Sequence, residues 1–263
     1  SHWLKSPMSQ DSSRSAALHP RDPLLGPPQA QPRMPPAPAQ IFYGIAGAAC
    51  AAFLIRTLAE QPLFPWQSDS AAWASAWLLM TVVDYYTVAV CVCGVFISTE
   101  GWLRGAIWSV LMLLLGAPFA CTYVCYHALR GGSLTLATSR ECTSSCSGLP
   151  MVLLYATLGL AFAGRLVWTL YEYPLVPLRP EDAAWSYQWL LTTIGDYYIA
   201  SSVLIGVVLS TEPTMPALLW SIVQLLLGGP LNCAYVIYCL HRFGSLRLTE
   251  PGGAFGKIGA PLQ

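Results

Sequence analysis

Long apolar segments, separated by short breaks rich in proline, glycine or charged residues, dominate the chain from residue 41 onward. Several of them hold about 20 apolar residues, the length that an α-helix needs to cross the hydrocarbon core of a bilayer. The breaks delimit six such helices. We place them at residues 41–60, 70–98, 102–130, 151–172, 182–210 and 214–243. The pattern therefore predicts an all-α integral membrane protein.

The same pattern occurs twice, at a constant offset of 112 residues that relates Asp84 to Asp196. A Trp-x-x-x-Trp motif, an Asp-Tyr-Tyr motif and a Ser-Thr-Glu motif all recur at this offset. Self-similarity of this kind indicates an internal duplication. Because each copy holds three predicted helices, an odd number, the second copy would enter the membrane from the opposite side. We therefore expect six transmembrane helices, arranged as two inverted three-helix repeats.

This duplication predicts a five-part organisation. Residues 1–40 are rich in proline and lack apolar periodicity, so they cannot bury enough surface to fold alone and are predicted to form an extended tail. Such a tail becomes ordered against a partner, and we expect it to lie along a neighbouring subunit. The other parts are a first membrane repeat at 41–137, a linker loop at 138–150, a second membrane repeat at 151–248 and a C-terminal tail at 249–263.

Composition supports the membrane assignment and excludes other classes. The 263 residues are 55% hydrophobic and only 10% charged, whereas soluble domains average roughly 25% charged residues. The mean hydropathy is +0.51. A net charge of zero gives no basis for a nucleic-acid partner, and no zinc-type spacing of cysteine and histidine occurs. Membrane lipids are the expected surroundings.

The nine cysteines do not form a disulfide framework. Seven of them lie inside apolar segments, where a cysteine behaves as a small core residue. Cys142 and Cys146 share the central loop, and they are a candidate disulfide if that side of the membrane is oxidising.

Each repeat places one carboxylate in the middle of a long apolar helix. Asp84 and Asp196 lie fourteen residues from both ends of their predicted helices, or roughly 21 Å, too far to reach water. An ionisable residue at this depth is a functional candidate by default, and two carboxylates near the midplane would suit proton coupling. The structural alternative is that each aspartate is protonated or hydrogen-bonded and locks helices together. The predicted midplane polar cluster consists of Asp84, Asp196, Arg165, Thr81, Thr193, Tyr85 and Tyr197.

The third predicted helix of each repeat is interrupted by a glycine and a proline. These helix breaks are Gly116 with Pro118, and Gly228 with Pro230. Proline removes a backbone donor and disturbs the helix. Paired breaks in inverted repeats are associated with transport sites, whereas small residues at the same positions can instead let two helices approach closely.

Four side chains near helix ends are candidate pigment ligands, because a chlorophyll magnesium accepts one axial oxygen or nitrogen. Glu100 and Glu212 lie in the Ser-Thr-Glu turns, where the alternative is that these residues cap the next helix. His127 and His241 are not repeat partners, and the alternative for both is a histidine at the membrane interface.

A mid-membrane aspartate flanked by aromatic residues, a glutamate at the following turn, a tryptophan and then Cys-x-Tyr form a pattern in each repeat. In the first repeat these residues are Asp84, Glu100, Trp108, Cys121 and Tyr123. The pattern resembles a family of small multi-span membrane proteins of plants and algae that is filed as a domain of unknown function. The resemblance covers residues 43–136 and 155–248. It implies a photosynthetic eukaryote and no catalytic residues.

From the tail, the resemblance and the lack of a cofactor motif, we expect a non-catalytic accessory subunit of a large organellar membrane complex, with a photosystem–antenna supercomplex favoured. No cofactor is required, but chlorophyll, carotenoid or lipid would be bound. The thylakoid is favoured over the mitochondrial inner membrane, with both termini on the stromal or matrix side by the positive-inside rule. The alternative function is a small proton-coupled transporter that uses the two aspartates. We do not expect an enzyme, because no nucleophile or metal motif accompanies them.

Overall fold

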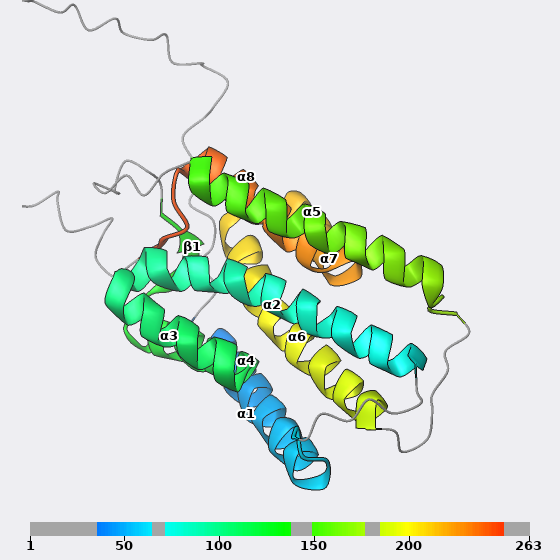
Figure 1. Ribbon diagram of the computed structural model, residues 1–263. Coiled ribbons are helices and arrows are strands. Elements are labelled where there is room, and N and C mark those ends of the chain that lie inside the picture. The colour runs from blue at the N-terminus through cyan, green and yellow to red at the C-terminus, as the bar shows by residue number, and fades with distance from the viewer. Residues whose placement is uncertain (1–35, 65–71, 138–148, 177–184, 250–263) are drawn as a thin grey trace, which may run out of the picture. The chain divides into compact units, whose positions relative to one another are not determined.

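The computed structural model describes residues 36–64, 72–137, 149–176 and 185–249, and all of them belong to one compact unit, Arg33–Gln263. Within these residues the chain is mostly helical, as predicted (Figure 1). The helices are α1 (Pro36–Glu60), α2 (Ala72–Glu100), α3 (Trp102–Leu115), α4 (Ala117–Leu129), α5 (Leu149–Glu172), α6 (Trp185–Thr211), α7 (Thr214–Leu227) and α8 (Gly229–Phe243), and the strands are β1 (Ser133–Leu136) and β2 (Leu248–Thr249).

Among the described residues, four helices are long and apolar enough to cross a membrane, namely α1 from Pro38 onward, α2, α5 and α6. This number differs from the six predicted. The segments 102–130 and 214–243, each predicted as one continuous helix, instead form the pairs α3–α4 and α7–α8. The helix α1 also begins at Pro36, inside the segment that was predicted to be an extended tail.

The helices α3 and α4 fold back on each other at Gly116. The ring centroids of Trp108 in α3 and Tyr123 in α4 lie 5.4 Å apart. Arg130, directly after α4, lies 3.7 Å from Glu100, directly before α3. Contacts between residues at similar distances on either side of Gly116 are those of a helical hairpin. We call this segment hairpin 1 (102–129).

The helices α7 and α8 form an equivalent hairpin at Gly228, which we call hairpin 2 (214–243). The rings of Trp220 and Tyr235 are 5.4 Å apart, and Arg242 Nη1 lies 2.7 Å from a carboxylate oxygen of Glu212. Both hairpins therefore begin and end on the same side of the unit.

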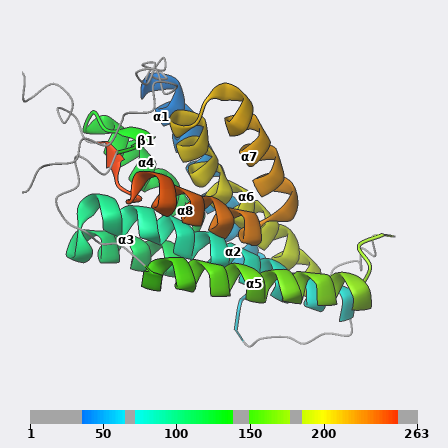
Figure 2. The same cartoon turned by 90° about the horizontal axis from the view of Figure 1, so that it is seen from above.

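The helices α2 and α6 pack along each other at the centre of the unit (Figures 1 and 2). Their first turns share one apolar cluster, built around Trp73, Trp77, Trp185 and Trp189. Their second halves share the larger core. The two helices consequently run in the same direction. Around them, α1 packs against α4, and α5 packs against α8.

Contacts between the two repeats show how the repeats are oriented relative to each other. The Nε1 atom of Trp73, at the start of α2, donates to the carbonyl of Pro174, just after α5, at 3.1 Å. Reciprocally, Trp185 Nε1, at the start of α6, donates to the carbonyl of Pro62, just after α1, at 3.0 Å. In an inverted arrangement these partners would lie at opposite ends. The two repeats therefore point the same way, and the inverted arrangement does not hold in the structure. The physical reason is that each hairpin returns the chain to the side it came from.

A second pair of reciprocal contacts lies toward the other end of the long helices. Tyr43, in the first half of α1, donates its hydroxyl to the Ser202 carbonyl in α6 at 2.8 Å. Tyr155, in the first half of α5, donates to the Val90 carbonyl in α2 at 3.4 Å. The two contacts are equivalent: a shift of 112 residues turns each residue of one contact into the corresponding residue of the other, with the two repeats exchanged. This is expected when two like surfaces meet across a two-fold axis.

A short sheet that the sequence did not predict joins the ends of the two repeats. Strands β1 and β2 pair antiparallel. The Leu136 N–H donates to Thr211 Oγ1, and the Leu248 N–H donates to Thr99 Oγ1, both at 3.1 Å. Each threonine of the Ser-Thr-Glu motifs thus binds the strand that follows the other repeat's hairpin, rather than capping the next helix. Neither Gly101 nor Pro213, the residues before α3 and α7, makes a side-chain capping bond.

The outward faces of the peripheral helices are apolar. Large side chains that are exposed there include Ile45 in α1, Leu114 in α3, Leu160 in α5 and Leu219 in α7. Exposed aliphatic side chains on these four helices suit a lipid environment, because contact with hydrocarbon tails carries no solvation cost for them. The fold thus agrees with the predicted membrane location.

Candidate functional site

The tip of hairpin 1 requires a glycine. Gly116 has φ 90° and ψ −172°, a conformation that is open essentially to glycine alone. A Cβ atom at this position would also lie 3.0 Å from both carboxylate oxygens of Asp196. The tip therefore places the backbone of hairpin 1 directly against an acidic side chain from α6.

Asp196 satisfies the first free backbone donor of α4. Its Oδ1 atom accepts a hydrogen bond from the Ala117 N–H at 2.8 Å. The next residue, Pro118, has no N–H, and the Phe119 N–H donates to the Gly116 carbonyl at 3.3 Å. The first turn of α4 thus leaves none of these donors unpaired, which matters at membrane depth. A carboxylate is also favoured at the positive end of a helix dipole.

Asp84 accepts the equivalent hydrogen bond at the tip of hairpin 2. Its Oδ1 atom accepts from the Gly229 N–H at 2.6 Å. Pro230 again removes one donor, and the Leu231 N–H donates to the Gly228 carbonyl at 3.1 Å. Asp84 belongs to the first repeat and hairpin 2 to the second, so the repeats exchange carboxylates. This is the structural role for the aspartates that the sequence left open, with backbone amides as partners in place of threonine, tyrosine or arginine.

The first tyrosine of each Asp-Tyr-Tyr motif binds the other broken helix end. Tyr85 donates its hydroxyl to the Met112 carbonyl in α3 at 3.0 Å, and Tyr197 donates to the Gln224 carbonyl in α7 at 3.3 Å. These carbonyls belong to the tyrosine's own repeat. Each hairpin tip is consequently held by a phenol from its own repeat and a carboxylate from the other.

The remaining residues of the predicted midplane cluster do not bind either aspartate. Thr81 and Thr193 donate to the carbonyls of Trp77 and Trp189, one turn earlier in their own helices, at 2.8 Å in both cases. Arg165 is exposed on α5. Within the part of the chain that the structure describes, it forms no ion pair with either aspartate. Arg165 therefore does not join the aspartates in the predicted midplane polar cluster.

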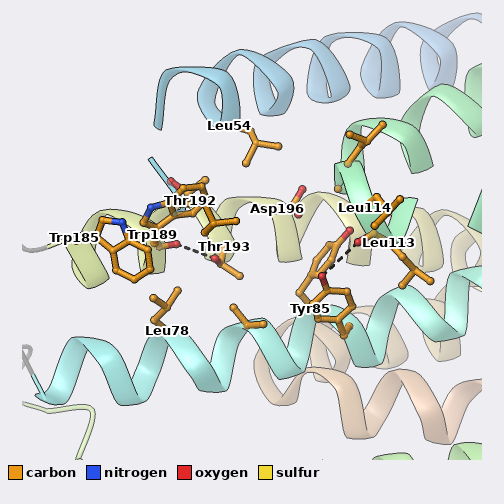
Figure 3. A pocket seen from close by; sticks show the side chains of 15 residues that line it. Leu54, Leu78, Tyr85, Leu113, Leu114, Trp185, Trp189, Thr192, Thr193 and Asp196 are labelled. Carbon is orange, nitrogen blue, oxygen red and sulfur yellow. Dashed lines mark hydrogen bonds between the residues drawn. The ribbon is translucent and has the colours of Figure 1, made fainter. Parts of the chain in front are cut away.

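A pocket of about 240 Å³ lies between α1, α2, α6 and the tip of hairpin 1 (Figure 3). Asp196 and Gly116 line one end of it, and Trp185 and Trp189 line the other. Leucine, valine and tyrosine side chains form its walls. A largely apolar cavity with a few polar groups is the usual form of a small-molecule site. The Asp196 carboxylate thus contacts both the hairpin tip and a cavity that can hold a ligand.

Two hydrogen-bonding residues of hairpin 2 escaped the sequence reasoning. Gln224 and Asn232 are fully buried. Asn232 Nδ2 donates to the Gly228 carbonyl at 3.1 Å, whereas neither side-chain polar atom of Gln224 has a hydrogen-bond partner among the described residues. Their counterparts in hairpin 1 are Met112 and Ala120. A position-by-position search for polar residues that replace apolar ones between the repeats would have found both.

A thiol also distinguishes the two tips. Cys50 in α1 donates its thiol to Asp196 Oδ1 at 3.3 Å, and the equivalent residue in the second repeat is Phe162. The seven described cysteines are all free. The candidate disulfide of Cys142 and Cys146 lies outside the described residues.

The candidate pigment ligands lie at the ends of the hairpins. Glu212 is buried against Arg242, and Glu100 lies beside Arg130, so each glutamate has a cationic partner across its hairpin. His127 is buried and stacks on Tyr123, with ring centroids 6.0 Å apart. His241 is exposed. No group of three or more histidine, cysteine or acidic residues that could hold a metal ion occurs in the described ranges.

Comparisons with protein-family models, with curated proteins and with solved structures found no match. The resemblance to a plant and algal family therefore stays a prediction. The functional assignment has to come from the geometry of the hairpin tips and the pocket.

Proposed function

We propose that this protein is a small membrane transporter, in which four helices span the bilayer and two re-entrant hairpins reach its interior from one side. The solute binds in the pocket beside Asp196. The observation that carries the proposal is that this pocket is lined by a carboxylate which also holds the tip of hairpin 1. A solute in the pocket and the position of the hairpin are thereby linked through one side chain.

The dimensions of the hairpins support the re-entrant arrangement. Helices α3 and α7 have 14 residues each, which gives a length of roughly 21 Å. The hydrocarbon core is about 30 Å thick, so each tip would end inside it. Broken backbone at that depth is tolerated only where protein groups satisfy it, and the Asp-Tyr-Tyr motifs supply those groups. The repeats would then be related by an axis along the membrane normal, as in transporters built from parallel repeats.

The hydrogen bond from Ala117 to Asp196 would act as a latch. A hydrogen bond to an ionised acceptor is stronger than one to a neutral acceptor. A proton or a cationic solute that reaches Asp196 reduces the negative charge facing Ala117 and weakens the latch. Hairpin 1 is then free to move and to expose the pocket to the side from which it enters. This coupling retains the proton dependence of the alternative function that the sequence raised.

The accessory-subunit hypothesis remains a prediction. It depended on a family resemblance and on the tail at 1–40, of which residues 1–35 lie outside the described residues and the rest begin α1. Three further expectations also remain predictions: the thylakoid location, the bound pigments and the side of the membrane on which the termini lie. The transporter is preferred because a cavity and a carboxylate coincide at one hairpin tip.

Proteoliposomes loaded with a pH-sensitive dye test the proposal. We expect at least one member of a panel of small ammonium, neutral aromatic and carboxylate solutes to evoke a proton flux. Asp196→Asn removes the charge at the latch, and we expect it to lower that flux by about tenfold or more. Glu60→Gln is the matched control, because it makes the same carboxylate-to-amide change at an exposed site away from the pocket. The proposal fails if no solute evokes a flux above that of protein-free liposomes.

A further inference from the structure

We infer that the ligand of the pocket beside Asp196 is a small organic cation, an ammonium that carries an aromatic or branched apolar group. The inference rests on the proposed function and names its substrate class. It follows from three properties of the pocket: its charge, the free oxygen of its carboxylate, and the side chains of its walls.

The pocket has a negative charge and no positive side chain. Asp196 is the one ionisable carboxylate among the residues that line it, and no lysine, arginine or histidine is present there. The start of α4 adds the positive end of a helix dipole, which amounts to about half an elementary charge. The ionised site therefore keeps a net negative charge, which favours a cation and disfavours a carboxylate or phosphate.

One oxygen of this carboxylate is available. The Oδ1 atom accepts the hydrogen bonds from Ala117 and Cys50. The Oδ2 atom receives no hydrogen bond from any described residue. Asp196 itself is only partly buried and lines the pocket. A ligand ammonium placed beside Oδ2 would supply the missing charged partner, and by reducing the negative charge on the carboxylate it would weaken the latch at Oδ1 as proposed above.

The walls of the pocket suit a ligand with an apolar body that packs against aromatic side chains. Tyr85, Tyr86, Trp185 and Trp189 all line the cavity together with leucine side chains (Figure 3). Aromatic rings attract cations through their negative faces, and the leucines favour hydrocarbon. The volume of about 240 Å³ corresponds to roughly eight water molecules at about 30 Å³ each. A ligand of about ten non-hydrogen atoms therefore fits.

Two probes of the same shape separate charge from size. Benzyltrimethylammonium is a cation of the predicted size, and neopentylbenzene is its neutral carbon isostere. We would titrate each into the purified full-length protein and follow tryptophan fluorescence, to which Trp185 and Trp189 in the pocket contribute. We expect saturable binding of the cation, at least about tenfold tighter than that of the isostere. Asp196→Asn should remove this preference, and Glu60→Gln should preserve it.

Thr193→Lys is a second variant, which keeps the Asp196 side chain in place. Thr193 lines the pocket and bonds only within its own helix. A lysine there lies three residues before Asp196 and would pair with its carboxylate, so it should lower the affinity for the cation more than that for the isostere. Equal affinity for the two probes, or unchanged cation binding in a folded Asp196→Asn protein, would overturn the inference while leaving a transporter of another substrate class possible. Failure of both probes to bind would count against the pocket itself, and hence against the proposed function.

Discussion

At the scale of the residue, the Asp-Tyr-Tyr motif explains how a helix can be broken inside a membrane. The carboxylate accepts a hydrogen bond from the first backbone amide of the second helix of a hairpin. The phenol donates a hydrogen bond to a backbone carbonyl in the last turn of the first helix. At the depth proposed for the hairpin tips, no water would be present to hydrogen-bond the amide or the carbonyl. The motif therefore depends on the glycine at each tip, since a side chain there would push the carboxylate away.

Replacing Gly228 by alanine tests this dependence. Gly228 has φ 70° and ψ −145°, and a Cβ there would lie 2.6 Å from Asp84 Oδ2. We expect a loss of stability of about 1–3 kcal/mol from the backbone conformation alone, measured by thermal unfolding in detergent. Gly44→Ala in α1 is the matched control, because a Cβ there meets nothing within 4 Å. Equal melting temperatures for the two variants would contradict the tip geometry.

Asp84 should be more sensitive to the loss of its acceptor oxygen than to the loss of its charge. Asp84→Ala removes the partner of the Gly229 N–H, and the loss of such a cap costs about 0.5–2 kcal/mol in water-soluble helices. Asp84→Asn keeps an acceptor and should destabilise less. Urea or detergent titration of both variants measures the order. A larger loss in Asp84→Asn would show that charge, rather than hydrogen bonding, holds hairpin 2.

At the scale of the element, each hairpin is fixed by contacts with the central helices of both repeats. α8 packs against α2 from the first repeat, and α4 packs against α6 from the second. One of these contacts is a pair of thiols: Cys91 Sγ in α2 and Cys233 Sγ in α8 are 3.7 Å apart. The corresponding pair in the other half is Val203 and Cys121, which has a single thiol.

This asymmetry gives a test of where hairpin 2 lies. A membrane-permeant thiol oxidant, such as iodine, should join Cys91 to Cys233 and remove two thiols from the count obtained by alkylation after denaturation. Cys91→Val copies the residue that the second repeat uses at this position, and it should prevent that loss. An unchanged thiol count in the wild-type protein after oxidation, or the same loss of thiols in wild type and Cys91→Val, would place hairpin 2 away from α2.

At the scale of the whole molecule, two repeats that point the same way fix which loops share a side. Phe64 and Val176 are repeat partners that follow α1 and α5, and both are largely exposed. Trp102, at the start of hairpin 1, is exposed at the other end of α2. Four spans and two re-entrant hairpins put the first two residues on one side of the bilayer and Trp102 on the other.

Cysteines introduced at these positions one at a time make this measurable, in a background with Cys142 and Cys146 replaced by serine and the parent background labelled as the control for the seven remaining cysteines. We expect a membrane-impermeant maleimide to label Phe64→Cys and Val176→Cys from the same side of sealed vesicles, and Trp102→Cys from the opposite side. Labelling of Phe64→Cys and Val176→Cys from opposite sides would restore the inverted arrangement.

The amino-acid sequence by itself determined the long apolar helices that agree with a membrane location, the duplication, the ends of these helices to within a few residues, and the positions of Gly116 and Gly228 as breaks. All of these follow from hydrophobic length and local backbone chemistry, which act over a few residues. The direction of the chain after each break could not be predicted from the sequence, because a glycine and a proline permit either a kink or a reversal. Only the tertiary structure decided for a reversal, since the groups that stabilise each tip include a carboxylate from the other repeat, far away in sequence.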